Sequence, residues 1–249
     1  MVPKLNAIVF DAYGTLYDVH SVIAECNAIW PERGTAVSSL WRTKQLEWTW
    51  QRTLMGRYVD FHELTIAALR YAAATIILPC SDDTVARLLD AYEKLTPYPD
   101  ARDALESLRP ATMAILSNGS PNMLEPLVAN SGLDRWITDV ISVDALHVYK
   151  PTPRVYQLAC DRLELPPAEI GFVSANCWDA CGAKAFGLNV AWIERVTPEA
   201  MALACVKNDL VPPLTMFKAI RTQMDELGLQ PDIRIKALSE LPGLLKSFT

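Results

Sequence analysis

Clusters of histidine or cysteine are lacking in this chain of 249 residues. The three histidines, at positions 20, 62 and 147, form no H-E-x-x-H pattern. The six cysteines, at positions 26, 80, 160, 177, 181 and 205, are scattered and include no C-x-x-C pair. This spacing argues against a disulfide framework and against a structural zinc site, so we expect reduced thiols and a cytoplasmic protein.

An excess of basic residues and long apolar runs are also absent from the sequence. Lys and Arg number 23 against 29 Asp and Glu, and the net charge of −6 argues against nucleic acid as a partner. No stretch approaches the ~18–20 uncharged apolar residues that span a membrane. Lys4 precedes a short apolar run without a small-residue cleavage site, so a signal peptide is not expected. With 51% hydrophobic residues, the composition predicts a soluble globular protein that binds neither nucleic acid nor membrane.

Short apolar segments alternate with longer amphipathic ones over much of the chain. This alternation predicts βα units, and therefore an α/β fold with a Rossmann-like parallel sheet. The expected strands, each apolar enough to be covered on both faces, are Leu5–Phe10, Met113–Ser117, Val140–Ser142, Ile170–Ser174 and Val190–Ile193. The expected helices between them cover roughly residues 100–109, 121–131, 152–163 and 178–187.

Residues 18–97 break this alternation. They contain two long helical stretches, Ala36–Met55 and Phe61–Ile77. Because an insertion of about 80 residues is too long for a loop, we expect a helical cap domain after the first strand. Within it, Arg42 and Leu46 lie one helical turn apart and share a face.

The expected organisation therefore has three parts. Residues 1–17 and 98–196 form the core, and residues 18–97 form the cap. Residues 197–249 form a C-terminal extension of two or three helices, including Pro213–Met224, that packs on the core.

Four loops with chemically active side chains follow predicted strands. Parallel strands bring such loops to one edge of the sheet, which is where open α/β sheets place their sites. In chain order the loops offer a carboxylate, a hydroxyl with an amide, an ammonium and a second carboxylate. Their residues are Asp11–Thr15, Ser117–Ser120, Val148–Pro151 and Ser174–Asp179.

Asp11 stands where an apolar strand becomes a glycine-containing turn. Backbone N–H groups in such a turn can hold a carboxylate in its ionised form, as a nucleophile requires. The alternative is a capping aspartate at a strand–loop junction, which a short D-x-x-G-T motif does not exclude by itself. The other three loops favour the nucleophile.

The second and third loops also allow a structural explanation. Lys150 precedes Pro151, which favours an extended conformation and lets the side chain reach over the sheet edge. There it can neutralise Asp11 or bind an anionic group, although an isolated Lys-Pro pair is more often a solvated loop. Ser117 and Asn118 suit an anion at a helix N-terminus, although Ser-Asn-Gly alone is more often a turn.

Taken together, these loops resemble the haloacid dehalogenase superfamily. Its members use an Asp nucleophile on a Rossmann-like core under a helical cap, and most are Mg²⁺-dependent phosphatases. Those phosphatases carry a second Asp two residues after the nucleophile, where this chain has Tyr13, which titrates near ~10 and is a poor acid at neutral pH. Their fourth loop holds Mg²⁺ with several acidic residues, whereas here Asp179 is the one carboxylate. The comparison favours chemistry without metal or other cofactor.

The chain is more closely similar to the L-2-haloacid dehalogenases. The similarity runs from about Ala7 to Arg195 and includes a cap motif at residues 40–47, Trp50 and residues 58–61. The extended tail is similar to that of one subgroup, where it contributes to a dimer, so the resemblance implies a homodimer.

The resemblance implies two sets of site residues. The residues that take part in the reaction would be Asp11, Thr15, Arg42, Ser117, Lys150, Tyr156, Ser174, Asn176 and Asp179. The residues that bind substrate or halide would be Ala12, Tyr13, Arg42, Leu46, Phe61, Ser117, Asn118, Lys150 and Trp178.

The implied reaction converts small (S)-2-haloacids into (R)-2-hydroxyacids and halide. Asp11 would attack C2 and form an ester, while Arg42 would receive the halide and Lys150 would hold the substrate carboxylate. Asp179 would pair with Lys150 and is a candidate for activating the hydrolytic water. Two alternatives stay open, a phosphatase on the same scaffold and a catalytically silent binding protein.

Overall fold

The computed structural model describes residues 5–196, 202 and 227–245. Six strands form one sheet in the order β3-β2-β1-β4-β5-β6, and every neighbouring pair is parallel. The strands are β1 Ala7–Phe10, β2 Thr112–Ser117, β3 Asp139–Ser142, β4 Ile170–Ser174, β5 Asn189–Ile193 and β6 Ile233–Ile235. The predicted parallel α/β core is confirmed, with strand boundaries shifted by one or two residues.

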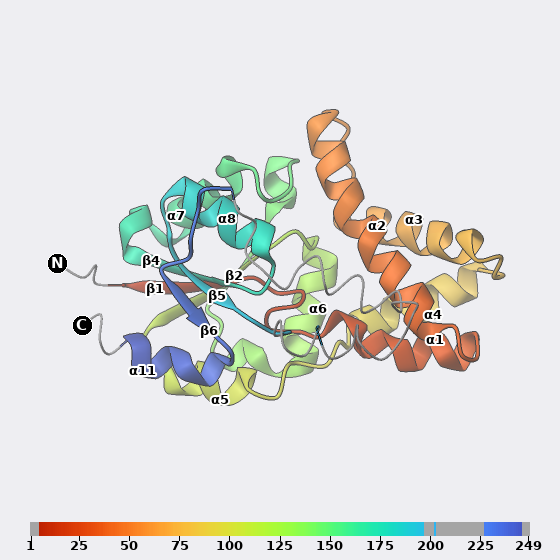
Figure 1. Cartoon of the computed structure of the whole chain (residues 1–249), viewed down its shortest axis with the longest axis horizontal. Coiled ribbons are helices and arrows are strands. Elements are labelled where there is room, and N and C mark those ends of the chain that lie inside the picture. The colour runs from red at the N-terminus through yellow and green to blue at the C-terminus, as the bar shows by residue number, and fades with distance from the viewer. Residues whose placement is uncertain (1–4, 197–201, 203–226, 246–249) are drawn as a thin grey trace.

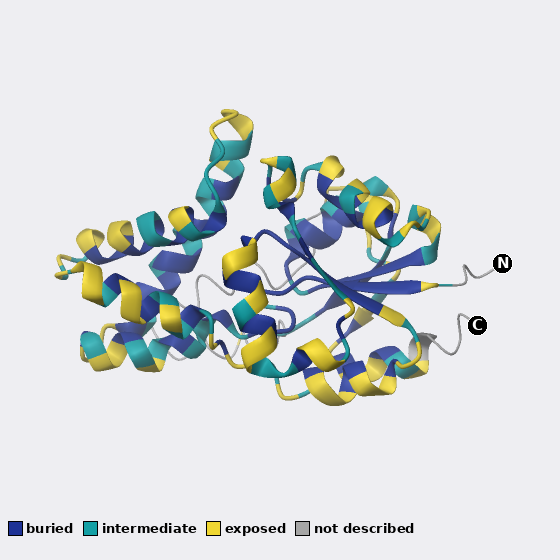
Figure 2. Cartoon of the chain, turned by 180° about the vertical axis from the view of Figure 1, so that it is seen from behind, coloured by how far each residue is buried: buried dark blue, intermediate teal, exposed yellow. Residues whose placement is uncertain are grey.

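Helices cover both faces of the sheet. In chain order the core α-helices are α5 Ala101–Ser107, α6 Pro121–Ser131, α7 Pro153–Leu163, α8 Cys177–Phe186 and α11 Leu241–Leu245. Helices α7 and α8 lie on one face and α5 and α11 on the other (Figure 1). Because both faces are covered, all four residues of β1 are buried, whereas the helices expose their outer faces (Figure 2).

A separate group of helices lies beside the carboxyl edge of the sheet (Figure 1). Its members are α1 Ile23–Ile29, α2 Gly34–Leu54, α3 Phe61–Thr75 and α4 Asp82–Tyr92. Side-chain caps mark the start of α3 and α4: Asp60 accepts a hydrogen bond from the Glu63 N–H, and Ser81 accepts one from the Thr84 N–H. Between α2 and α3, the Trp41 indole N–H donates to the Thr65 carbonyl at 2.9 Å. These helices occupy the segment in which the sequence predicts a cap.

Several hydrogen bonds join the cap to the core, and two of them involve residues next to the start of α3. The Tyr58 hydroxyl donates to Asp144 Oδ1 at 2.6 Å, and the Tyr149 hydroxyl donates to the Val59 carbonyl at 2.6 Å. Residues 58 and 59 lie just before Asp60, the N-cap of α3, so these contacts hold that helix over the sheet edge.

The C-terminal segment differs from the prediction of helices alone. Its strand β6 pairs with β5, and its 3₁₀ helix at Leu238–Glu240 packs near α5. A three-residue strand is too short to show an alternating pattern, which is why the sequence did not indicate it. The expected helix at Pro213–Met224 lies outside the described residues, and the homodimer stays a prediction. Within the described part of the chain, no helix is both long and apolar enough to cross a bilayer.

Candidate active site

Asp11 follows β1 at the carboxyl edge of the sheet. Its N–H donates to the Val173 carbonyl of β4 at 2.9 Å, and the residue is only 4% exposed. One carboxylate oxygen, Oδ2, accepts from Thr15 Oγ1 at 3.0 Å and from Asn176 Nδ2 at 2.8 Å. The other oxygen, Oδ1, accepts from Lys150 Nζ at 3.1 Å. The carboxylate is therefore fixed in orientation by donors from three different loops.

The turn after Asp11 folds back on itself. Gly14 has φ +92°, a conformation that side-chain-bearing residues rarely adopt, and its N–H donates to the Tyr17 carbonyl at 2.8 Å. The Ala12 carbonyl accepts from the N–H groups of Leu16 and Tyr17, both at 3.0 Å. This tight turn brings the Thr15 hydroxyl back toward the carboxylate four residues earlier.

Lys150 lies between two carboxylates. Its Nζ is 3.1 Å from Asp11 Oδ1 and 2.9 Å from Asp179 Oδ2, and its side chain is fully buried. The Lys150 N–H donates to Asn118 Oδ1 at 3.0 Å, which ties the second loop to the third. Burial alone would lower the pKa of Lys150, but the two carboxylates outweigh it and hold the pKa above its usual value. The ammonium thus stays charged at neutral pH.

Asp179, in the first turn of α8, is fully buried and held by three donors. Ser174 Oγ and Lys150 Nζ both donate to Oδ2 at 2.9 Å, and the Tyr156 hydroxyl donates to Oδ1 at 2.8 Å. Burial raises the pKa of Asp179 to about 6 even though Lys150 lowers it. Asp179 is therefore a carboxylate at neutral pH whose affinity for a proton exceeds that of an ordinary aspartate, as a general base requires.

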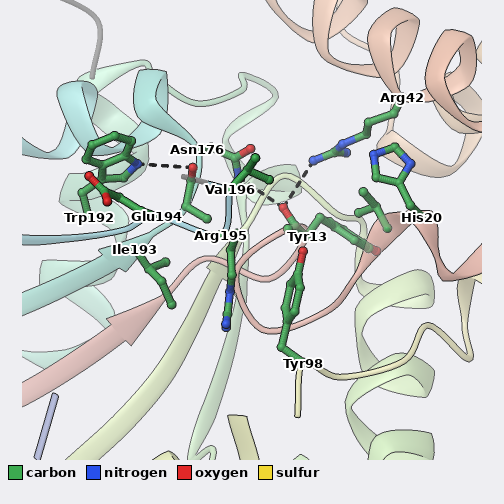
Figure 3. Close-up of a pocket in the computed structure, with 13 residues that line it drawn as sticks. Tyr13, His20, Arg42, Tyr98, Asn176, Trp192, Ile193, Glu194, Arg195 and Val196 are labelled. Carbon is green, nitrogen blue, oxygen red and sulfur yellow. Dashed lines mark hydrogen bonds between the residues drawn. The ribbon is translucent and has the colours of Figure 1, made fainter. Parts of the chain in front are cut away.

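Arg42 reaches toward this site from α2 of the cap. Its Nη2 is 3.4 Å from the Tyr13 carbonyl (Figure 3). Its Nη1 is 3.5 Å from Gln45 Oε1, and both distances are long for hydrogen bonds. The residue is only 5% exposed, yet among the described residues no carboxylate lies within 4 Å of its nitrogens. A buried guanidinium without a counter-ion is a strong site for an anion.

Apolar side chains surround the charged groups. The Tyr13 and Phe61 rings stack with centroids 5.8 Å apart, and Leu46 is 2% exposed. Trp178 meets Trp50 of the cap edge-on at 5.5 Å. Burial raises the pKa of Tyr13 far above its usual value, so its hydroxyl stays protonated at any physiological pH.

Two hollows flank the charged cluster. One has a volume of about 90 Å³ and lies between the cap and the core, with Arg42 and Asn176 in its wall (Figure 3). The other, about 470 Å³, is lined by Trp50, Tyr149, Lys150 and Trp178. Both reach residues of the predicted site, so the buried cluster lies close to space that a small ligand can enter.

A cation is poorly accommodated beside Asp11. Asn176 Nδ2 donates both to Asp11 Oδ2 and, at 3.1 Å, to the Tyr13 carbonyl, so an amide nitrogen stands between two oxygens that could ligate a metal. Among the residues that the structure describes, no group of three or more His, Cys, Asp or Glu side chains could hold a metal ion.

A family model described as haloacid dehalogenase-like hydrolase matches residues 5–187. The chain belongs to this hydrolase family. It is 47% identical over 244 residues to an (S)-2-haloacid dehalogenase of Xanthobacter autotrophicus, covering 98% of this chain and 96% of that protein. It is also 46% identical over 194 residues to haloacetate dehalogenase H-2 of a Moraxella species, covering 77% and 87% of the two chains.

A solved structure of a family member agrees with the fold along nearly the whole chain. It is the L-2-haloacid dehalogenase from Xanthobacter autotrophicus with chloropropionic acid covalently bound. The TM-score is 0.95 at 46% sequence identity, and the match covers 99% of this chain and 100% of that one. The resemblance inferred from the loop motifs is thereby confirmed, as is the prediction of an enzyme of this family.

Most residues predicted for the site lie together in the structure of this chain. Asp11, Thr15, Lys150, Asn176 and Asp179 form one hydrogen-bonded group that also includes Ser174 and Tyr156. Ser117 ends the adjacent strand β2, but its hydroxyl accepts from the Gly119 N–H at 3.1 Å rather than contacting that group.

Gln45 is a residue that the sequence analysis left without a role. It is fully buried, accepts from the Tyr92 hydroxyl at 2.9 Å and donates to Thr65 Oγ1 at 2.9 Å, and its Oε1 faces Arg42. Its spacing of three residues from Arg42 places both on one helix face, and that signal could have identified it.

Proposed function

We propose that this hydrolase removes halide from small (S)-2-haloacids and releases (R)-2-hydroxyacids, without a metal. The observation that carries the proposal is the pairing of a buried, oriented carboxylate, Asp11, with a buried guanidinium, Arg42, that has no carboxylate partner among the described residues. The (S)-2-haloacid dehalogenases to which the chain is similar, and the relative with covalently bound chloropropionic acid, support it.

In the first step Asp11 is the nucleophile. Its Oδ2 accepts two hydrogen bonds and its Oδ1 one, so Oδ1 keeps a lone pair free for attack. Oδ1 forms a bond to C2 of the substrate, the carbon–halogen bond breaks, and the electron pair leaves with the halide. In-line attack inverts C2 and leaves an Asp11 ester. The halide needs no proton, which suits a site whose neighbouring Tyr13 does not titrate.

Positive charge allows one anion to attack another. Lys150 Nζ has three N–H donors, of which two bind Asp11 and Asp179, so one is available for the substrate carboxylate. Ser117 is the last residue of the neighbouring strand β2, and its hydroxyl would bind the same substrate carboxylate. At the other end, Arg42 receives the halide, with Asn118 and Trp178 beside it.

In the second step water attacks the ester carbonyl carbon of Asp11. Asp179 accepts the proton of that water, and the hydroxyacid leaves as the Asp11 carboxylate is restored. Ser174 and Tyr156 hold Asp179 in place for this transfer. The product alcohol then takes up the proton, so Asp179 returns to its starting state.

The test is halide release from purified protein supplied with (S)- and (R)-2-chloropropionate in the presence of EDTA. We expect release from the (S)-acid only, formation of the (R)-hydroxyacid, and no loss on chelation. Asp11→Asn should abolish release, whereas Asp139→Asn, a charge loss at a surface ion pair with Arg162, should not. Mg²⁺-dependent hydrolysis of a phosphate ester without halide release would refute the proposal in favour of a phosphatase.

A single turnover in ¹⁸O-labelled water tests the ester route directly. Because water attacks the Asp11 carbonyl carbon, the label should enter the Asp11 carboxylate first and the product only in later turnovers. Label in the first product molecule would mean that water attacks C2 itself.

A further inference from the structure

Arg195, just after β5, contacts two other parts of the chain through its two terminal nitrogens, while its Nε is buried without a hydrogen-bond partner among the described residues. Its Nη1 donates to both oxygens of Asp100, at 2.9 and 2.8 Å, and its Nη2 donates to the Thr15 carbonyl at 2.7 Å. The guanidinium lies 3.9 Å from the centroid of the Tyr98 ring (Figure 3). The side chain is 13% exposed, so these contacts are largely shielded from water. Charge-assisted hydrogen bonds from two nitrogens of one planar guanidinium to two different residues fix their relative positions.

The residue that Arg195 holds is one that orients the nucleophile. Thr15 Oγ1 accepts from the Ala175 N–H at 2.9 Å and donates to Asp11 Oδ2 at 3.0 Å. With Ala175 on its acceptor side, the hydroxyl hydrogen is directed at the carboxylate. A shift of the Thr15 backbone would therefore change which lone pairs of Asp11 are engaged, and with them the angle at which Oδ1 meets C2.

Asp100 extends this connection to the C-terminal segment. Its Oδ2 also accepts from the Leu238 N–H at 2.8 Å, in the 3₁₀ helix that follows β6. One continuous path thus runs from Leu238 through Asp100, Arg195 and Thr15 to Asp11. A lysine reproduces it poorly, because Arg195 uses two separate nitrogens, Nη1 for Asp100 and Nη2 for the Thr15 carbonyl, whereas lysine has one.

We propose that Arg195 is a positioning residue that orients Asp11 through the Thr15 carbonyl and hydroxyl, and that Asp100 anchors it to the C-terminal segment. The proposal rests on the proposed function for its kinetic consequence, but its structural part is independent of it. If the Arg195 contacts only stabilised the fold, their loss would leave the rate of ester formation unchanged.

The kinetic test compares Arg195→Met, Arg195→Lys and a matched control, Arg234→Met. Arg234 also lies over an aromatic ring, Trp192, at 5.1 Å, but its side chain is 49% exposed and it contacts none of the site. Ester formation is followed in single turnovers by the mass added to the protein. We expect Arg195→Met to slow ester formation about 10- to 100-fold with KM changed less than about threefold, Arg195→Lys to recover part of the rate, and Arg234→Met to match the unmodified protein.

A double-mutant cycle decides whether Arg195 acts through Thr15. In a Thr15→Val background the directed hydroxyl is already gone, so Arg195→Met should slow ester formation little further. Multiplied effects would overturn the proposal. So would an Arg195→Met protein that has a lower Tm but forms the ester at the original rate.

Crystal structures of the two Met variants separate this proposal from the proposed function. The Thr15 Oγ1–Asp11 Oδ2 distance of 3.0 Å should lengthen in Arg195→Met and be kept in Arg234→Met, whether or not the protein turns over haloacids. An unchanged distance in Arg195→Met would overturn the positioning role. If Arg195→Met does not fold, Asp100→Asn, which keeps the Arg195 side chain and weakens its anchor, is judged by the same rate and distance.

Discussion

Replacing Lys150 by Met should make the stability of the protein strongly pH-dependent. The substitution keeps a side chain of similar length but leaves Asp11 and Asp179 buried without their shared cation. At the observed separations of 3.1 and 2.9 Å, each ion pair is worth about 5 kcal/mol at an effective dielectric constant of about 20, before desolvation is counted. Desolvation offsets much of this, so the net loss in the free energy of unfolding should be about 3–5 kcal/mol at neutral pH.

The pH dependence follows from proton uptake. Without the ammonium, the pKa of Asp179 should rise beyond its present value of about 6, well above the value of about 3.9 in an unfolded chain. The folded variant then binds a proton that the unfolded chain does not. Its stability is therefore greatest at low pH and falls by about 1.4 kcal/mol per pH unit until the folded pKa is passed.

Urea unfolding followed by far-ultraviolet circular dichroism at pH 5.5 and pH 8 measures this effect. Lys184→Met is the matched control, because Lys184 pairs with Asp232 at 2.7 Å with side chains 31% and 35% exposed. It should lose about 0–1 kcal/mol at both pH values. A Lys150→Met protein that loses the same free energy at both pH values would refute the argument that Lys150 neutralises buried carboxylates.

Three further predictions concern the surroundings of the cluster. If Asp179 is the base, the rate of ester hydrolysis should rise with pH through about 6 as Asp179 ionises, and a pH–rate profile of kcat measures it. Gly182→Ala should lower kcat and cost about 1–3 kcal/mol in urea unfolding, because the added methyl group would lie 2.6 Å from the Tyr156 hydroxyl. Gln45→Glu should place a carboxylate beside Arg42 and weaken inhibition by chloride about tenfold, or about 1.4 kcal/mol.

Gly182→Ala and Gln45→Glu each have a matched control variant. Gly243→Ala, where no atom lies within 4 Å of the added methyl group, should leave both kcat and stability near those of the original protein. Gln51→Glu changes an exposed glutamine of the same helix and should not alter chloride inhibition. An acidic limb well below pH 5 would exclude Asp179 as the titrating base, and chloride inhibition unaffected by Gln45→Glu would argue against Arg42 as the halide site.

The charged cluster was predictable because its loops follow strands that the sequence marks clearly. Each strand is a short apolar run, and parallel strands must end at the same edge of the sheet. Asp11, Lys150 and Asp179 come from three such ends, so their proximity follows from the fold class. The distances and the sharing of one ammonium between two carboxylates did not follow, because they depend on side-chain packing.

Other features depend on contacts between distant parts of the chain. Arg195 and Thr15 are 180 residues apart, and their contact requires knowing that β5 lies beside β4 and β4 beside β1. Strand β6 has three residues, too few for a period of two to be recognised, and it forms because β5 offers it an unpaired edge. The local sequence pattern does not indicate which distant strands pair.

The charged side chains of the site are divided between the core and the cap. At neutral pH, Asp11 and Asp179 outweigh Lys150 by one negative charge, so the core site alone repels an anionic acid. Arg42 brings the balance to zero, but it stands on α2 of the cap and contacts the core at the Tyr13 carbonyl. Substrate affinity should therefore depend on the cap lying against the core. Under the proposed function, a halide acceptor on the cap would couple recognition of an anion to exclusion of water from the site, and the attack proposed for Asp11 would require both.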